Sequence, residues 1–325
     1  MLRYIIKRII ILIPVVIVIS LILFQISKLM PGDPIRAMLP TNMRPEVYQT
    51  AYDNMARRLG HDKSWIEQYF RWVSNIVINR DLGYSTMFNR PVIDVIGEPL
   101  RNTILLNVFV NIFYLSIALL IGIKMAIKRN SMFDNSMQVF SIVTYSIPSF
   151  FLGLSLIFIF GVHLRWVPLG GMPNRAMLGE GWPLISSWIR HLALPVVTLT
   201  IISLAGAMRY VRNAMIDALS QDYIRTARSK GLSEKVVIYS HAFRNALIPI
   251  STVIVVTIFA LLIGSVVTES VFQYNGMGLL LLKAVNSRDT MTIISMNLIF
   301  AFVNVIAVLL ADIIYGLVDP RIKLK

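Results

Sequence analysis

The chain has 325 residues, of which 56% are hydrophobic and 15% charged, whereas soluble domains carry about 25% charged residues, so a lipid bilayer is its expected solvent. The absence of cysteine excludes a disulfide framework, a thiolate metal site and a cysteine nucleophile, and four scattered histidines do not suggest a zinc cluster. The 31 Lys and Arg residues against 17 Asp and Glu give a net charge of +14, a balance often found in proteins that bind nucleic acid or anionic lipid.

Six stretches of at least 18 residues contain no Asp, Glu, Lys or Arg, and each could cross the roughly 30 Å core of a bilayer as a helix. They are 9–27, 102–123, 135–164, 191–208, 245–268 and 290–311. A seventh apolar run, 270–282, is too short to span and contains glycines, which favours a re-entrant or interfacial segment. The sequence therefore predicts an all-α, polytopic membrane protein with six transmembrane helices.

The first stretch follows Arg3, Lys7 and Arg8, as a secretory signal would. It is longer than the apolar region of such a signal and leads into Pro-Gly-Asp-Pro at 31–34 instead of a cleavage site, which favours a retained helix. Six spans place both termini on one side of the membrane. If that side is the cytoplasm, the inner segments hold 16 Lys and Arg residues against five in the short outer loops. We therefore expect an N-in, C-in orientation, in which the excess charge reflects topology and no nucleic acid is a partner.

These spans divide the chain into four parts: a tail with the first helix (1–30), an extracytoplasmic region (31–101), a core of five helices (102–316) and a cytoplasmic tail (317–325). In the outer region, Trp65, Tyr69, Trp72 and Ile76 recur at helical spacing. They predict an amphipathic helix that packs on the protein or the headgroup layer; docking of an external partner is the minority interpretation. No recognisable motif lies in 41–62.

Several functions lack the residues that they need. The six stretches hold no ionisable relay, which disfavours a proton-driven transporter. The chain has no phosphate-binding loop of the form GxxxxGKS or GxxxxGKT, and no GxSxG or HExxH motif. It is therefore not expected to be an enzyme by itself, and any ATP that drives it would bind to another chain.

The largest inner loop, 209–245, contains a stretch that is typical of a short helix. Asp222 is expected to be its N-cap, and Gly231 is expected to follow its end in the left-handed conformation. Ser233 could cap a second helix that continues through His241 towards Pro249. The two helices would then meet at a glycine elbow on the cytoplasmic side.

Two interpretations of this elbow stay open on the residues alone. Its small and apolar face, made of Tyr223, Ile224, Ala227 and Leu232, could fit a groove on a cytosolic protein, with Ala227 permitting close approach. Alternatively, the segment is an ordinary interfacial helix whose basic residues bind anionic headgroups. Those basic residues are Arg225, Arg228 and Lys230.

The same segment resembles the EAA loop of binding-protein-dependent ABC importer permeases, in the version typical of the oligopeptide and dipeptide family. The family pattern is close to D-Y-I-R-T-A-R-A-K-G-L, then H-x-x-x-N-A-x-x-P; here these are 222–232, with Ser229 in place of Ala, and 241–249. Arg225-Thr226-Ala227 stands where the general motif has Glu-Ala-Ala, as is usual in the peptide branch. Further motifs extend the resemblance over essentially the whole chain: YIIKR (4–8), PGDP (31–34), DLGYS (81–85), RPV (90–92), IPSF (147–150), WVP (166–168), HLALP (191–195), GSVV (264–267), GMG (276–278) and DPR (319–321).

The resemblance implies a type I ABC importer permease in the bacterial cytoplasmic membrane, without catalytic, cofactor or metal residues of its own. It implies four kinds of partner: a second homologous permease forming a heterodimer, two cytosolic ATPases that bind ATP and Mg, an extracytoplasmic peptide-binding protein, and an oligopeptide or dipeptide substrate. Nickel, a metal–chelator complex or glutathione is the alternative substrate; an ATP-independent channel or a sodium-coupled carrier is a remote alternative function. The ATPase-coupling residues that it implies are Asp222, Tyr223, Ile224, Arg225, Thr226, Ala227, Arg228, Gly231, Leu232 and Glu234.

Overall fold

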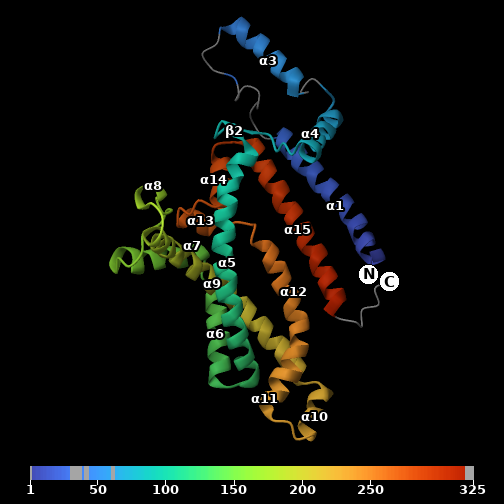
Figure 1. The fold of residues 1–325 in the computed structure, drawn as a ribbon, viewed down its shortest axis with the longest axis vertical. Coiled ribbons are helices and arrows are strands. Elements are labelled where there is room, and N and C mark those ends of the chain that lie inside the picture. Colours follow the sequence, from blue (N-terminus) through green and yellow to red (C-terminus); the bar gives the residue numbers. More distant parts are fainter. Residues whose placement is uncertain (1, 30–38, 40–43, 60–62, 319–325) are drawn as a thin grey trace.

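The computed structural model describes residues 2–29, 39, 44–59 and 63–318. Most of them lie in helices, and the longest helices run along the length of the molecule (Figure 1). The described part also contains one antiparallel hairpin, in which β1 (Tyr84–Ser85) pairs with β2 (Arg90–Pro91). The predicted all-α class therefore holds apart from this hairpin. The predicted 319–325 part of the tail lies outside the described residues.

Three helices are long and apolar enough to cross a membrane: α5 (Val92–Ile127), α9 (Trp182–Leu219) and the 290–311 part of α15 (Thr290–Val318). A fourth span results if α6 (Met132–Ser146) is joined to α7 (Ser149–Leu156) and η1 (Ile157–His163), although the two halves meet at 99°. The two remaining predicted stretches coincide with α1 (Leu2–Leu29) and α12 (Arg244–Ala260). By length and composition alone, the described residues thus support three or four of the six predicted spans.

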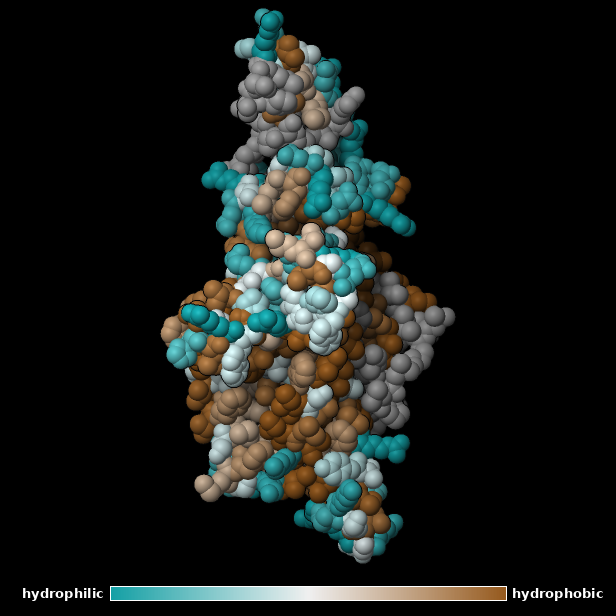
Figure 2. Space-filling view, turned by 60° about the vertical axis from the view of Figure 1, so that its left-hand side comes forward, coloured by the Kyte–Doolittle hydropathy of each residue, from teal (hydrophilic) through white to brown (hydrophobic). Residues whose placement is uncertain are grey.

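The long helices pack in pairs around α5 and α9, which lie against each other along much of their length (Figure 1). On one side α6 and α7 pack against α9; on the other side α12 lies between α9 and α15. Helix α1 packs on the outer face of α15 and runs antiparallel to it. On the face shown in Figure 2, apolar residues predominate in the middle of the molecule, and hydrophilic residues gather towards its two ends. Such a surface is expected where lipid chains surround a protein.

The predicted amphipathic helix in the outer region is α4 (Trp65–Asn79), and α3 (Pro45–Leu59) precedes it. Tyr69 is buried against α1: its ring lies 5.6 Å from that of Phe24, and its hydroxyl is 2.8 Å from that of Ser20. Trp72 also packs on Phe24, at 5.7 Å. The aromatic stripe therefore contacts the protein, as predicted, through its middle residues, whereas Trp65 at its beginning is exposed.

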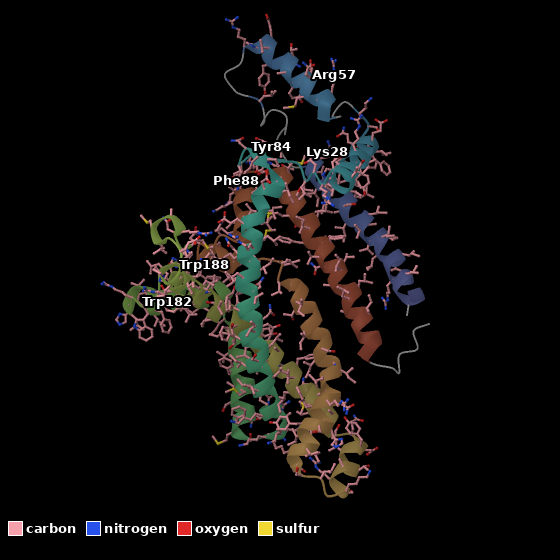
Figure 3. The ribbon with its side chains drawn as sticks, in the orientation of Figure 1. Lys28, Arg57, Tyr84, Phe88, Trp182 and Trp188 are labelled. Carbon is pink, nitrogen blue, oxygen red and sulfur yellow. The ribbon has the colours of Figure 1, made fainter. Side chains whose placement is uncertain are left out.

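The hairpin of β1 and β2 is fastened to the beginning of α15 by a buried carboxylate. Asp289 is fully buried and accepts hydrogen bonds from the hydroxyls of Ser85 and Thr292, the latter at 2.8 Å. Figure 3 places Tyr84 and Phe88 of this hairpin at the top of α5. The same figure places Trp182 and Trp188 at the beginning of α9, beside α8 (Arg175–Leu178) and on the side of the molecule away from α1.

The seventh apolar run forms two short helices, α13 (Val266–Val271) and α14 (Met277–Asn286), joined by a tight turn. They pack on each other, and α14 also packs on α5 and α15. With six and ten residues, neither is long enough to span a bilayer. The prediction of a non-spanning segment is therefore confirmed.

A buried ion pair joins the first turn of α6 to α9. Arg212 donates from Nε to Asp134 Oδ1 at 2.6 Å and from Nη2 to Asp134 Oδ2 at 2.7 Å. The side chains are 0% and 13% exposed for Asp134 and Arg212 respectively. The backbone N–H of Asn130 also donates to Asp134 Oδ2, at 2.9 Å, so both carboxylate oxygens are satisfied. A buried pair of this kind is costly to break because the remaining charge is left without a partner.

We expect Asp134→Asn to lower the free energy of unfolding by about 3–5 kcal/mol, since Arg212 would stay buried without a counter-ion. SDS titration of the purified protein in mixed micelles measures this change. The matched control is Glu180→Gln, which removes an exposed ion pair with Arg175 and should cost less than about 1 kcal/mol. Equal losses in the two variants would contradict the assignment of a structural role to the buried pair.

Candidate functional site

The predicted coupling segment lies at one end of the molecule, beyond its apolar middle (Figures 1 and 2). Helix α9 has 38 residues and is roughly 57 Å long at 1.5 Å per residue. It therefore extends well past a bilayer core and carries the segment away from it. Two short helices follow, α10 (Asp222–Ser229) and α11 (Glu234–Val236), and the chain then returns through η2 (Val237–Phe243) into α12.

The first helix of the segment begins one residue earlier than the sequence suggested. Gln221 is the N-cap, with an extended backbone, and Asp222 is the first helical residue. The prediction that Asp222 caps the helix is therefore wrong by one position. Its carboxylate still lies next to the positive end of the helix dipole, where a negative charge is favourable. The hydroxyl of Thr226 donates to the Asp222 carbonyl at 3.1 Å, which adds a bond within the helix.

The predicted left-handed glycine is confirmed. Gly231 has φ +77°, and its N–H donates to the carbonyl of Arg228 at 2.9 Å, which closes the end of α10. A Cβ at this position would meet no atom within 4 Å, so a lack of space does not explain the glycine. The positive φ explains it, because glycine adopts this conformation without steric cost. Ser233 is the N-cap residue of the second helix, as predicted, although its hydroxyl makes no capping hydrogen bond. The helix passes His241, as predicted, and is wound as a π-helix over 237–243.

An ion pair bridges the elbow. Arg228 donates from Nε to Glu234 Oε1 at 2.8 Å and from Nη2 to Glu234 Oε2 at 3.3 Å. Both side chains are largely exposed, so the pair contributes at most about 1 kcal/mol to stability. Its two-point geometry fixes the direction in which Arg228 points. A second pair, Arg225 with Asp222 at 4.0 Å, is almost fully exposed and contributes less.

Ile224 and Ala227 do not face outward. They are 0% and 5% exposed and lie in a cluster that we call the elbow core, with residues from α5, α9, η2 and α12. The core consists of Ile123, Ala126, Val211, Met215, Ala218, Ile224, Ala227, Val237, Ala242, Ala246 and Ile250. The expectation that these two residues fit a groove on another protein is therefore wrong. The close approach that Ala227 permits is between α10 and the chain's own helices.

The other eight predicted coupling residues are exposed, and they form a surface that we call the coupling face. Tyr223 and Leu232 are each 39% exposed and supply its apolar part. Partial burial raises the pKa of the Tyr223 phenol above its ordinary value. The remaining members are polar or are the glycine: Asp222, Arg225, Thr226, Arg228, Gly231 and Glu234.

Three buried carboxylates were not found by the search for charge-free stretches because each lies one residue outside such a stretch. Asp134 precedes the stretch that begins at 135, Glu269 follows the one that ends at 268, and Asp289 precedes the one that begins at 290. Glu269 is 1% exposed and accepts hydrogen bonds from Thr103 and from the backbone of Leu279, each at 3.0 Å. A search for polar residues at helical spacing on 102–123 would have found Thr103, the partner of Glu269, since Thr103, Asn107 and Asn111 recur every four residues.

Comparisons with known proteins identify the family of the chain. The family described as binding-protein-dependent transport system inner membrane component matches residues 118–324, and the model of its N-terminal part matches 1–114. The two matches together cover almost the whole chain.

Three curated relatives are similar over nearly their full length. A putative peptide permease protein of Brucella suis is 37% identical over 99% of both chains. The oligopeptide transport system permease protein AppB of Bacillus subtilis is 36% identical over 99% of this chain and 100% of its own. The di/tripeptide transport system permease protein DppB of Pseudomonas aeruginosa is 35% identical over 99% of both chains. The chain therefore belongs to the family of binding-protein-dependent transport system inner membrane components and is a multi-pass protein of the bacterial cytoplasmic membrane.

Proposed function

We propose that this chain is the permease subunit of an ATP-driven ABC importer that moves oligopeptides or dipeptides into the cell. The family match and the full-length relatives named as peptide, oligopeptide and di/tripeptide permeases carry the proposal. The exposed elbow at one end of the molecule supports it, because a transporter without its own nucleotide site needs a surface that receives work from another chain. A permease for nickel, a metal–chelator complex or glutathione is the alternative.

The proposed topology has six spans with both termini in the cytoplasm. Six helices, three of them long and one of them bent, correspond to the six charge-free stretches. Helices α1 and α15 run antiparallel, so Leu2 and Val318 lie towards the same end of the pair (Figure 1). The excess of Lys and Arg in the short loops on that side supports the orientation.

The proposed partners follow from what this chain lacks and what the family name states. A binding protein would deliver peptide from outside, and a second, homologous permease would complete the pathway as a heterodimer. Two cytosolic ATPases would bind ATP and Mg and would carry out hydrolysis. This chain would supply the pathway and the lever, and no catalytic residue or cofactor.

In the proposed mechanism, the coupling face docks on an ATPase subunit and moves with it. The elbow core joins α10 to α5, α9 and α12, so a displacement of α10 is passed to these three helices together. A rigid elbow transmits such a displacement better than a flexible loop, because less of the movement is absorbed locally. The helices would then alternate between inward-facing and outward-facing arrangements, and peptide would be released inside.

Uptake by the purified complex tests the function directly. The complex that copurifies with this chain is reconstituted in liposomes and supplied with alanine peptides of two to six residues, its binding protein and ATP. We expect peptide to accumulate only when ATP is hydrolysed. Uptake without ATPase subunits, or accumulation of nickel or glutathione in place of peptide, would overturn the proposal in favour of a named alternative.

The double substitution Tyr223→Ala with Leu232→Ser should release the ATPase subunits, because it removes the apolar part of the coupling face. Co-purification and uptake should both fall, while the amount of inserted protein stays unchanged, since both side chains are exposed. Met177→Ser, at an exposed residue in the outer segment, is the control. By contrast, Ile224→Ala should lower stability by about 2–5 kcal/mol, because Ile224 is buried. Normal ATPase binding by the double variant would contradict the assignment.

Substitutions of Gly231 separate elbow geometry from side-chain contacts. Gly231→Val should uncouple ATP hydrolysis from uptake, because a β-branched residue strongly resists φ +77° and the elbow would have to change direction. Gly231→Asn should retain most of the uptake, since asparagine adopts the left-handed conformation most readily after glycine. The measurement is peptide moved per ATP hydrolysed, and equal ratios in the two variants would show that the direction of the elbow is not needed.

A further inference from the structure

The outer end of α12 is held by a side chain of α5. Asn107 donates from Nδ2 to the carbonyl of Leu261 at 3.0 Å and to that of Ile263 at 3.2 Å. These carbonyls lie just beyond the last residue of α12, where the chain has left the helix. Further along the same pair of helices, the Tyr114 hydroxyl donates to the Thr257 hydroxyl at 2.9 Å.

One turn before Asn107, Thr103 fastens α13 and α14 to the same helix. Its hydroxyl donates to Glu269 Oε1 at 3.0 Å and accepts from the N–H of Met277 at 2.8 Å. Its neighbour Asn102 donates to the carbonyl of Asn275 at 2.8 Å. The non-helical segment after α12 is thus bonded to α5 directly through Asn107. The helices α13 and α14 that follow this segment are bonded to α5 through Thr103.

Glu269 is the centre of this arrangement. Thr103 and the backbone of Leu279 donate to its two oxygens, and the carboxylate lies at the beginning of α14, where the helix dipole favours a negative charge. A Cβ on Gly276 would lie 2.5 Å from Glu269 Oε2, so only glycine lets the turn pass this close to the carboxylate. An acidic side chain buried to 1% exposure is costly to keep at a place where an apolar residue could pack. The cost indicates that a defined position is needed here.

The inner end of α12 is held by apolar packing, whereas the outer end is held by hydrogen bonds. Ala246 and Ile250 belong to the elbow core, and the helix continues without a break through η2 and α11 to the exposed elbow. One end of α12 is therefore attached to the surface that we propose receives the movement of the ATPases. The other end is bonded to α5 by directional polar contacts.

We propose that Thr103, Asn107 and Glu269 are positioning residues for transport, which hold the outer end of α12 on α5 as a fixed pivot. When the elbow moves, α5 and α12 then tilt together and α12 does not slide along α5, because the outer ends are held to each other as the inner ends are in the elbow core. This inference rests on the proposed function, because a pivot is needed only if the elbow is driven. Without the polar contacts at the outer end, α12 would slide along α5 when the elbow moves. ATP hydrolysis would then proceed with little opening of the pathway.

The test variant is Thr103→Val, which keeps the shape of the side chain and removes the hydroxyl. In the reconstituted complex, supplied with the same alanine peptides, the peptide moved per ATP hydrolysed should fall about tenfold, since a buried group left without its bond changes an equilibrium by about that factor. ATP hydrolysis itself should continue. Thr103→Ser should restore the ratio because it restores the hydroxyl.

Thr200→Val is the matched control, because Thr200 is also buried but its hydroxyl has no partner among the described residues. It should leave the ratio unchanged. Asn107→Leu should lower the ratio as Thr103→Val does, and the double variant should be no worse than either single one if both act on one pivot. A wild-type ratio in both single variants would overturn the proposal, as would failure of both to assemble with the ATPases, because the residues would then act on folding.

A second measurement does not depend on peptide. The natural chain has no cysteine, so spin labels can be placed on introduced cysteines at the exposed residues Ile112 of α5 and Val267 of α13. In the wild-type complex, the distance between the two labels should be the same with and without an ATP analogue. In the Thr103→Val complex, the distribution of that distance should broaden. A distance that changes with nucleotide in the wild type would refute the pivot, even where uptake confirms the function. A fixed distance in a complex that moves no peptide would refute only the function.

Discussion

The constraint on which this structure depends is that a bilayer offers no water to a backbone that leaves the helical conformation. Every interruption must be satisfied by the protein itself. At the break after α12, the Asn107 amide of α5 donates to two backbone carbonyl groups. The Thr103 hydroxyl of α5 donates to the Glu269 carboxylate and accepts from a backbone N–H. Thr103 and Asn107 of α5 are therefore placed by the needs of another segment, which explains their spacing of one turn on an apolar helix. Asn111, one turn further, donates within α5.

The same constraint explains which parts of the fold could be predicted from the sequence. Absence of charge over the length of a bilayer is a direct physical requirement, so helices cover most of each of the six predicted stretches. The 99° bend between α6 and α7 could not be found in this way, because a filter that counts only charges does not register a change of direction. Asp134, Glu269 and Asp289 were missed for a related reason: a carboxylate ends a charge-free stretch whether it lies in water or in the core.

At the candidate site, the sequence predicted the elbow better than its surroundings. Gly231 could be identified because a left-handed residue at the end of a helix has a strong local preference for glycine. The burial of Ile224 and Ala227 could not be assigned, since an apolar face shows that something covers it and not which chain does. Only the packing of α9 and α12 around α10 decides that their cover is internal.

The buried and the exposed residues of the elbow have different roles, and this difference matters for the proposed coupling. The buried residues fix the position of α10 relative to three helices, whereas the exposed ion pair of Arg228 and Glu234 adds little stability and sets only the outline that a partner meets. The ion pair of Asp134 and Arg212 extends the rigid unit from α9 to α6, because breaking it would leave a charge buried. In the proposed mechanism, a movement that arrives at the coupling face is therefore divided among helices whose inner ends cannot move independently, and their outer contacts determine how each one responds.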